Sequence, residues 1–251
     1  VPDRFEFSGA STPMFQTFGL PDSSCNATVP APRRFFTYVG QSFWYVSGLL
    51  TPMATLNAVN AAGALTQNYP LDTGVAGRPT ISETYTDSAA PAAAPLNTTA
   101  VSTPSAVTGA GTALYSGSPS GSLSYTRSTT APVGPFNAAI VLTVTASDAT
   151  DAAIPGNGTI TTPTPQVFNG GGGGIAFDGS DFNSGAGLPA GRTMIFGRLR
   201  SANANGSPLV PLLLRMETQY YSGAPANAFL ANTADHCTSI AASGLGSDIA
   251  L

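Results

Sequence analysis

The stretch Ala138–Ala146, AAIVLTVTA, is a short run of β-branched and small apolar residues, which is typical of a β-strand. Similar runs recur along the chain between Gly, Pro, Asn and Asp residues, and almost no stretch has the spacing of an amphipathic helix. The sequence therefore predicts an all-β fold. The other strand candidates are Arg4–Phe7, Arg34–Val39, Phe43–Val46, Ala54–Asn60, Thr80–Tyr85, Leu123–Arg127, Thr159–Thr162, Met194–Ser201 and Leu209–Tyr221.

The residues between these candidates suggest how the fold is divided. Asn60–Ala64 and Asn205–Gly206 are expected to be hairpin connections, whereas residues 88–121, rich in Ala, Pro, Ser and Thr, are expected to form a long loop. We expect an immunoglobulin-like β-sandwich architecture, as one large or two packed sandwiches with long Ala/Pro/Thr/Gly-rich loops. The expected parts are a β-sandwich domain at 1–150 that contains the loop 88–121, a Gly-rich connection at 151–174, and a second β subdomain at 175–251.

Composition excludes several classes of protein. Charged residues are 9% of the chain, against about 25% in ordinary soluble domains, and all nine cations are arginines. Disorder is disfavoured because 42% of the residues are apolar and the net charge is only −4. A sequence pI near 4.7 with scattered arginines is a poor match for nucleic acid as a partner. No apolar run is long enough to predict a membrane-spanning helix.

The two cysteines, Cys25 and Cys237, lie far apart, and with a single histidine they offer no ligand set for a structural zinc ion. A disulfide between them would close nearly the whole chain, which the chain-entropy model values at roughly 5 kcal/mol. Such a bond would place the protein in an oxidising compartment. Free thiols and a bond to a neighbouring subunit remain alternatives.

Catalytic groups are sparse in this sequence. The only histidine, His236, is adjacent to Cys237, and neighbours on a strand point to opposite faces. The three glutamates Glu6, Glu83 and Glu217 lie in or beside strand candidates, with no acidic cleft apparent around them. We therefore expect a protein that is not an enzyme and that needs no cofactor.

Two places in the sequence are possible binding sites. Asp178, Asp181 and Asn183 supply oxygen ligands at short spacing in a Gly-rich stretch, but they lack the spacing of an EF-hand, so they are a weak Ca²⁺ candidate and an ordinary polar turn is favoured. Trp44 and Tyr45 belong to an aromatic cluster that is suited either to stacking on a ligand or to a core or subunit interface. We favour the core or interface.

The segment FGRLRSANANGSPL at Phe196–Leu209, followed by TQYY at Thr218–Tyr221 and NTADHCT at Asn232–Thr238, resembles a known family. That family is a domain of unknown function found in large bacterial surface proteins, including the biogenesis protein encoded with mannose-sensitive haemagglutinin type IV pili. Two residues depart from the family pattern: His236 stands in place of a serine, and Tyr221 in place of a tryptophan.

The resemblance implies a location and raises the expectation that Cys25 pairs with Cys237, because the family carries cysteines at both places. It also implies that the chain is a segment of a longer precursor. We expect a non-enzymatic structural or assembly module of a bacterial surface appendage or pilus-associated protein, exported across the inner membrane and working through subunit packing. The expected partners are copies of itself or other surface proteins. The alternative is an adhesin domain that binds a glycan or a host surface protein.

Overall fold

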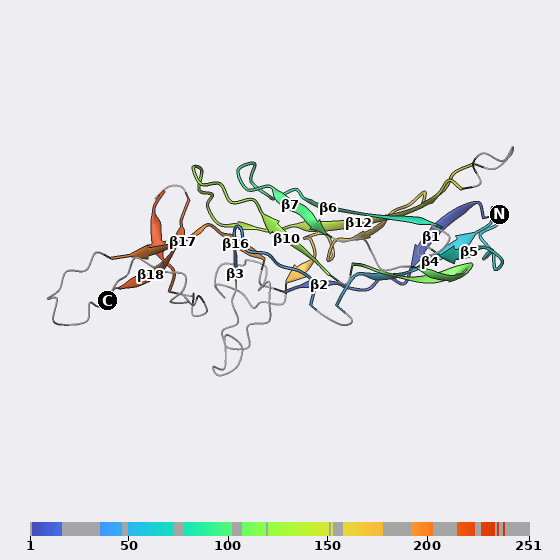
Figure 1. Ribbon diagram of the computed structural model, residues 1–251, viewed down its shortest axis with the longest axis horizontal. Coiled ribbons are helices and arrows are strands. Elements are labelled where there is room, and N and C mark those ends of the chain that lie inside the picture. The colour runs from blue at the N-terminus through green and yellow to red at the C-terminus, as the bar shows by residue number, and fades with distance from the viewer. Residues whose placement is uncertain are drawn as a thin grey trace, which may run out of the picture.

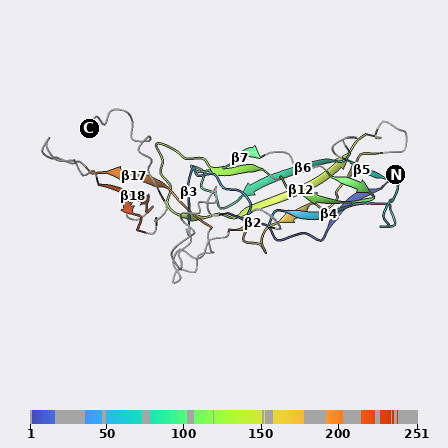
Figure 2. The same ribbon diagram turned by 60° about the horizontal axis from the view of Figure 1, so that its bottom comes forward.

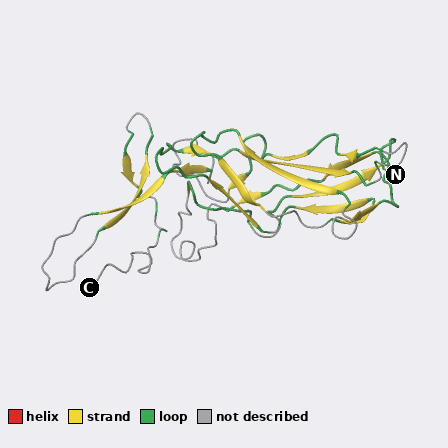
Figure 3. Ribbon diagram, turned by 45° about the horizontal axis from the view of Figure 1, so that its top comes forward, coloured by secondary structure: helices red, strands yellow, loops and turns green. Residues whose placement is uncertain are grey.

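The computed structural model describes residues 2–16, 36–46, 50–72, 78–101, 107–118, 120–150, 152, 158–177, 192–202, 215–223, 227–233, 235 and 238. Within these residues the chain consists of strands and loops without helix, which confirms the all-β prediction (Figure 3). The strands are β1 Arg4–Ser8, β2 Met14–Phe15, β3 Phe36–Tyr38, β4 Met53–Val59, β5 Pro70–Asp72, β6 Thr80–Asp87, β7 Leu96–Val101, β8 Thr108–Ala110, β9 Thr112–Ser116, β10 Gly121–Tyr125, β11 Phe136–Asn137, β12 Ile140–Asp148, β13 Ile160–Thr161, β14 Gln166–Phe168, β15 Ala176–Phe177, β16 Thr193–Ile195, β17 Gly197–Ser201, β18 Met216–Tyr221 and β19 Phe229–Ala231.

The strand β12 lies at the centre of one layer of the sandwich. Its side chains alternate between buried and half-buried along the whole strand, because successive residues of a strand point to opposite faces. Ile140, Leu142 and Val144 are fully buried, and they belong to the main hydrophobic core. On one side β12 pairs with β6 in antiparallel register, from Ile140 opposite Asp87 to Ser147 opposite Thr80, and on the other side with β13 and β14.

The second layer is a five-stranded sheet in the order β1-β4-β9-β8-β5. Its inward residues Phe5, Leu56 and Leu71 pack with Ala146 and Ile160 of the first layer, so apolar side chains of both sheets fill the space between them. This arrangement is that of a β-sandwich, as the sequence predicts.

Four smaller sheets extend the sandwich: β10-β7, β11-β16-β3, β15-β2 and β17-β18-β19. The described strands form an elongated body, with β1, β4 and β5 near one end and β17 and β18 near the other (Figures 1 and 2). The strands β15 and β16 pair with β2 and β3, which lie early in the chain. Up to residue 195 these later strands therefore pair with strands from the start of the chain, whereas β17, β18 and β19 pair with one another.

The predicted hairpin at Asn60–Ala64 is confirmed. The Asn60 backbone N–H donates to the Ala64 carbonyl, and the Asn60 side chain accepts hydrogen bonds from the N–H groups of Ala62 and Ala64. Gly63 has a φ of 82°, which a residue without Cβ adopts readily. Asparagine and glycine together therefore form this turn.

Three local expectations were wrong. The long loop at 88–121 contains β7, β8 and β9, because threonine is a good strand residue even where large apolar side chains are few. The predicted strand Phe43–Val46 is reduced to two isolated bridges, Phe43 to Leu123 and Phe15 to Tyr45. The run Met194–Ser201 divides at Phe196 into β16 and β17, which belong to different sheets.

The glycine stretch after β14 generates a stability prediction. Gly174 has a φ of +89°, and a Cβ there would lie 2.6 Å from the Ala139 backbone, whereas Gly171 has a φ of +80° and nothing within 4 Å. Both Gly174→Ala and Gly171→Ala introduce strain of about 1–2 kcal/mol from the left-handed backbone conformation. Gly174→Ala adds a clash with the backbone, so we expect the larger loss of unfolding free energy for Gly174→Ala in urea titrations. Equal losses would contradict the close approach.

Candidate functional site

The most distinctive polar feature of the interior is a set of tyrosine hydroxyls that donate to carboxylates. The Tyr115 hydroxyl lies 2.6 Å from Glu83 Oε1 and links β9 of the five-stranded sheet to β6 of the opposite layer. The Tyr125 hydroxyl of β10 donates in the same way to Asp87 of β6. These hydrogen bonds join different sheets, so they hold the layers in a fixed relation.

A third bond of this kind stands at the end of β12, where the Tyr69 hydroxyl donates to the buried Asp148 carboxylate. Asp148 also accepts hydrogen bonds from the Thr150 backbone and hydroxyl, at 2.7 and 2.5 Å, and lies 3.9 Å from Arg78 Nε. Burial acts to raise the pKa of Asp148, but the bonds from Thr150 and Tyr69, together with Arg78, hold that pKa below its ordinary value. The ionised carboxylate is therefore favoured in the folded protein.

The strand β6 places its acidic residues inward by simple alternation. Ile81, Glu83, Tyr85 and Asp87 lie on the face turned to the interior, while the serine and threonine residues between them are exposed. Burial raises the pKa of Glu83, and the hydrogen bond from Tyr115 only partly offsets this effect. Glu83 Oε2 has no hydrogen-bond partner among the described residues. In contrast to Asp148, the ionised form of Glu83 is disfavoured by folding.

The sequence candidates Trp44 and Tyr45 lie beside this network. Tyr45 is buried in the main core, and its hydroxyl is 3.3 Å from that of Tyr85. Trp44 is half-buried against Tyr45 and Tyr85, and a Cβ at Gly121 would lie 2.8 Å from its ring. The structure thus places Tyr45 inside the sandwich and packs Trp44 against it.

A second cluster lies where β16 passes into β17. A Cβ at Gly197 would come within 2.3 Å of the Tyr38 ring, so only glycine allows the ring to lie there. The Tyr38 hydroxyl donates to Asp235 Oδ2 at 2.6 Å and accepts from Asn232 Nδ2 at 2.9 Å. Tyr38 belongs to β3, whereas Asn232 follows β19 at the end of the molecule. The ring and its hydroxyl therefore connect two sheets; we call Tyr38, Gly197, Asn232 and Asp235 the junction.

Arg127 reinforces the junction from the neighbouring strand end. Its guanidinium carbon lies 4.5 Å from the centre of the Phe196 ring, and its Nη2 donates to the Gly197 carbonyl at 2.9 Å. The exposed cation therefore makes two contacts at the junction, one with the face of the Phe196 ring and one with a backbone carbonyl. Arg127 and Tyr38 therefore both contact the chain at the point where it passes from one sheet to the next.

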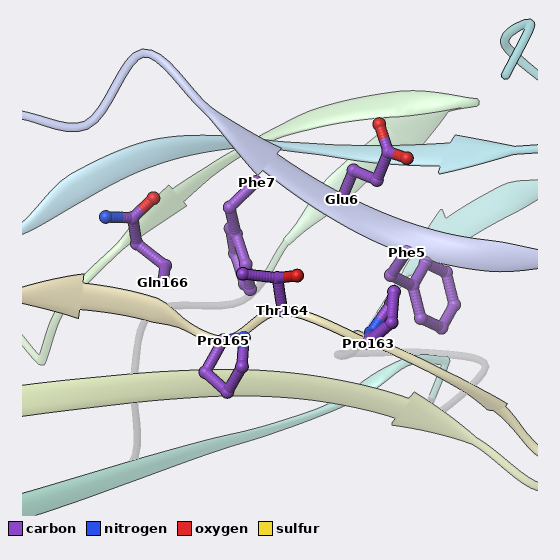
Figure 4. A pocket seen from close by; sticks show the side chains of 7 residues that line it. All are labelled: Phe5, Glu6, Phe7, Pro163, Thr164, Pro165 and Gln166. Atoms are coloured by element: carbon purple, nitrogen blue, oxygen red, sulfur yellow. The ribbon is translucent and has the colours of Figure 1, made fainter.

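One surface hollow of about 250 Å³ separates β1 from the segment Pro163–Gln166. In Figure 4 Phe7 points toward Thr164, whereas Glu6 points to the other side of β1. Pro163 and Pro165 have no backbone N–H, so this segment cannot form a regular hydrogen-bond ladder with the edge of β1. We interpret the prolines as protection of a sheet edge against unwanted pairing.

Several sequence candidates lie outside the described residues: Cys25, Cys237, His236, Asp178, Asp181 and Asn183. The disulfide and the Ca²⁺ site therefore stay predictions. The described part of the chain contains no group of three or more His, Cys, Asp or Glu side chains placed to hold a metal ion. In the same part, no helix is long and apolar enough to cross a membrane.

Comparison with protein-family models shows which family the chain belongs to. A family model described as DUF6701, third domain, matches residues 1–165, and one described as DUF6701, fourth domain, matches residues 195–249. The chain belongs to the DUF6701 family. The fourth-domain match of this DUF6701 chain starts within one residue of the point where β16 ends and the sheet pairing changes. Searches among curated proteins and among solved structures gave no match.

Prediction from the sequence missed the acidic residues that accept the tyrosine hydrogen bonds. From the sequence, Glu83 was placed only in or beside a strand, and no role was predicted for Asp87 or Asp148. A signal was present in TISETYTD at Thr80–Asp87, where Ile81 and Tyr85 share a face with Glu83 and Asp87. If the apolar pair faces the core, the two acids must face it as well.

The opposite pKa shifts of Glu83 and Asp148 predict opposite effects of neutralisation. Glu83→Gln keeps an acceptor for Tyr115 and removes a charge that burial disfavours, so this variant should be more stable than wild type at pH 7. The gain should shrink as the pH falls, because the raised pKa of Glu83 means that the wild-type protein regains its proton first in the folded state.

Asp148→Asn is the matched comparison and should behave in reverse. It gives up charge-assisted hydrogen bonds worth about 1.5–3 kcal/mol, so its unfolding free energy at pH 7 should be lower. This loss should fade as the pH falls through the lowered pKa of Asp148, because the wild-type protein loses the same contribution there. Urea titrations between neutral and acidic pH measure both. A loss of stability in both variants at pH 7 would refute the assignment for Glu83.

Proposed function

We propose that this chain is a non-enzymatic structural module of an extracellular bacterial surface protein, part of an appendage or associated with a pilus, and that it acts through packing contacts. The observation that carries the proposal is the continuous segment Thr193–Ser201. It supplies β16 to a sheet of the main body and β17 to the end sheet, with only Phe196 between them. A covalently continuous strand shared by two sheets resists bending between them.

The junction adds side-chain support to this segment. Tyr38 sits against Gly197 and bonds with Asn232 and Asp235, so the two sheets are joined through residues almost two hundred positions apart in the chain. The cross-layer tyrosine bonds stiffen the main body in the same way. An elongated shape with fixed joints suits a part that acts as a spacer or bears load (Figures 1 and 2).

Surface location and pilus association rest on the resemblance of FGRLRSANANGSPL and NTADHCT to domains of bacterial surface proteins. Low charge supports assembly by packing, since a weakly charged surface lets copies or partner proteins approach closely.

Removing the Tyr38 hydroxyl tests the joint. In Tyr38→Phe the Asp235 carboxylate and the Asn232 amide each lose a bond, so local opening of the end sheet should become easier by about 1–2 kcal/mol. Hydrogen exchange of β17 and β18 should then accelerate roughly 5- to 30-fold, with β12 unchanged. The control Tyr221→Phe removes a hydroxyl whose hydrogen bond goes to exposed Asn227, six positions later in the chain, so this bond does not link two sheets. Unchanged exchange in Tyr38→Phe would show that the junction does not hold the sheets together.

Location and assembly are tested in the cells that make the protein. Brief protease treatment of intact cells should release fragments of this chain, and a short cross-linker should join it to copies of itself or to other surface proteins. Protection from protease until the cells are lysed would overturn the surface assignment. A protein that is surface-exposed but never cross-linked would overturn assembly through packing.

A further inference from the structure

The arginines of the described chain fall into two groups. Four of them, far from the end sheet or at its junction, are engaged by the protein itself. Arg4 bonds with Asp3 and Glu6, Arg78 lies near Asp148, Arg127 contacts Phe196 and Gly197, and Arg192 donates to the carbonyls of Gly173 and Gly174. These four arginines stabilise the fold through internal contacts. The other three lie together on the end sheet.

The register of the end sheet puts these three on one face. Arg198 lies opposite Gln219, and Arg200 lies opposite Glu217. The Ala202 N–H donates to the Arg215 carbonyl, which continues the same pairing by one step. Directly paired residues of an antiparallel sheet share a face, and so do residues two apart on a strand. Arg198, Arg200 and Arg215 therefore form what we call the arginine face.

The charge of this face differs from that of the whole chain. Three arginines stand with one acidic residue, Glu217, so the face carries a net charge of about +2 at neutral pH. The complete sequence has a net charge of −4. A local excess of positive charge on an acidic protein favours an anionic partner at that place.

Arg198 and Arg200 make contacts within the end sheet, whereas the guanidinium of Arg215 is left without a partner among the described residues. Arg198 lies 3.7 Å over the Phe229 ring and donates from Nε to Gln219 Oε1 at 2.8 Å. Gln219 in turn donates to Glu217 Oε1 at 2.5 Å, which Arg200 Nη1 approaches only to 3.5 Å. The side chain of Arg215 has no hydrogen-bond or acidic partner among the described residues, and the residue is exposed.

The uncommitted guanidinium borders a hollow. A cavity of about 210 Å³ is lined by Arg200, Ala202, Arg215 and Glu217. It is smaller than the roughly 300–1,000 Å³ of pockets that enclose drug-sized ligands, so it suits one unit of a larger molecule. The strands β17 and β18, which carry or adjoin these residues, lie at the end of the elongated body opposite β1 (Figure 1). A polymer can reach such a position without entering the sandwich.

We propose that this cavity binds a carboxylate-bearing sugar unit of an acidic polysaccharide. The guanidinium of Arg215 offers the planar paired donors that a carboxylate accepts, and Arg200 adds positive charge beside it. Glu217 accepts hydrogen bonds but cannot donate when ionised, so it selects a ligand that brings hydroxyl donors beside its carboxylate. A uronic acid unit has both groups, whereas the side chain of an acidic peptide has only the carboxylate. This binding role goes beyond the proposed structural function and does not depend on it.

The test measures binding of the full chain to a short oligogalacturonate by calorimetry at low salt. Arg215→Gln should weaken binding about 10-fold or more, since a charge-assisted hydrogen bond is lost. Arg215→Lys, which keeps the charge but not the paired donors, should fall between wild type and Arg215→Gln. The matched control Arg4→Gln removes the same charge at the other end of the molecule and should bind as wild type does. Thermal unfolding of each variant confirms that it is folded.

Comparison ligands complete the test. A neutral malto-oligosaccharide should not bind, and added salt should weaken binding of oligogalacturonate. Equal weakening by Arg4→Gln would reduce the effect to overall charge and overturn the site. Full binding in Arg215→Gln would overturn it too. If polyglutamate of similar length bound as tightly as oligogalacturonate, the assignment to a sugar would be wrong and an acidic polypeptide would take its place.

Discussion

Hydrogen bonds from tyrosine hydroxyls to carboxylates connect the layers of this sandwich, and the placement of the other elements depends on them. Tyr115 reaches Glu83, Tyr125 reaches Asp87 and Tyr69 reaches Asp148, each from a different sheet or its edge. A chain with nine arginines and no lysine has few cations to spare for its buried acids. Phenol groups are suited to this task because the ring fills the apolar core while the hydroxyl satisfies the carboxylate.

The same chemistry extends to the far end of the molecule. At the junction, Tyr38 of β3 again donates to a carboxylate, that of Asp235, across two sheets. Its ring occupies the space left open by Gly197, at the point where one strand segment passes from the main body to the end sheet. With the layers and the end sheet fixed in this way, Arg198 and Arg200 of β17 and Arg215 just before β18 lie on one face of the end sheet, where each of the three residues is exposed.

Much of the fold could be predicted because strand formation leaves a local signature. The run of β-branched and small apolar residues at Ala138–Ala146 predicted β12, and Asn60–Ala64 carried the residues that a tight turn requires. Where the local signal was weak, prediction failed: threonine and alanine between 96 and 116 form three strands whose stability comes from their neighbours. Trp44 and Tyr45 were recognised as a cluster, but their position in the core depends on Tyr85 and Gly121, which are distant in sequence.

The sequence by itself determined the fold class and the scarcity of charge, because both follow from residue type. It also determined that Glu83 and Tyr85 lie on one face of β6, because side chains along a strand alternate with a period of two. The tertiary structure alone decided which tyrosine meets which acid, since these partners are 32 to 197 residues apart in the chain. Among the arginines in the described part of the chain, it also decided which side chain is left without a hydrogen-bond or acidic partner. Arg4, Arg127 and Arg215 are alike in sequence, and only the packing around each one shows that the first two are engaged and that Arg215 is available.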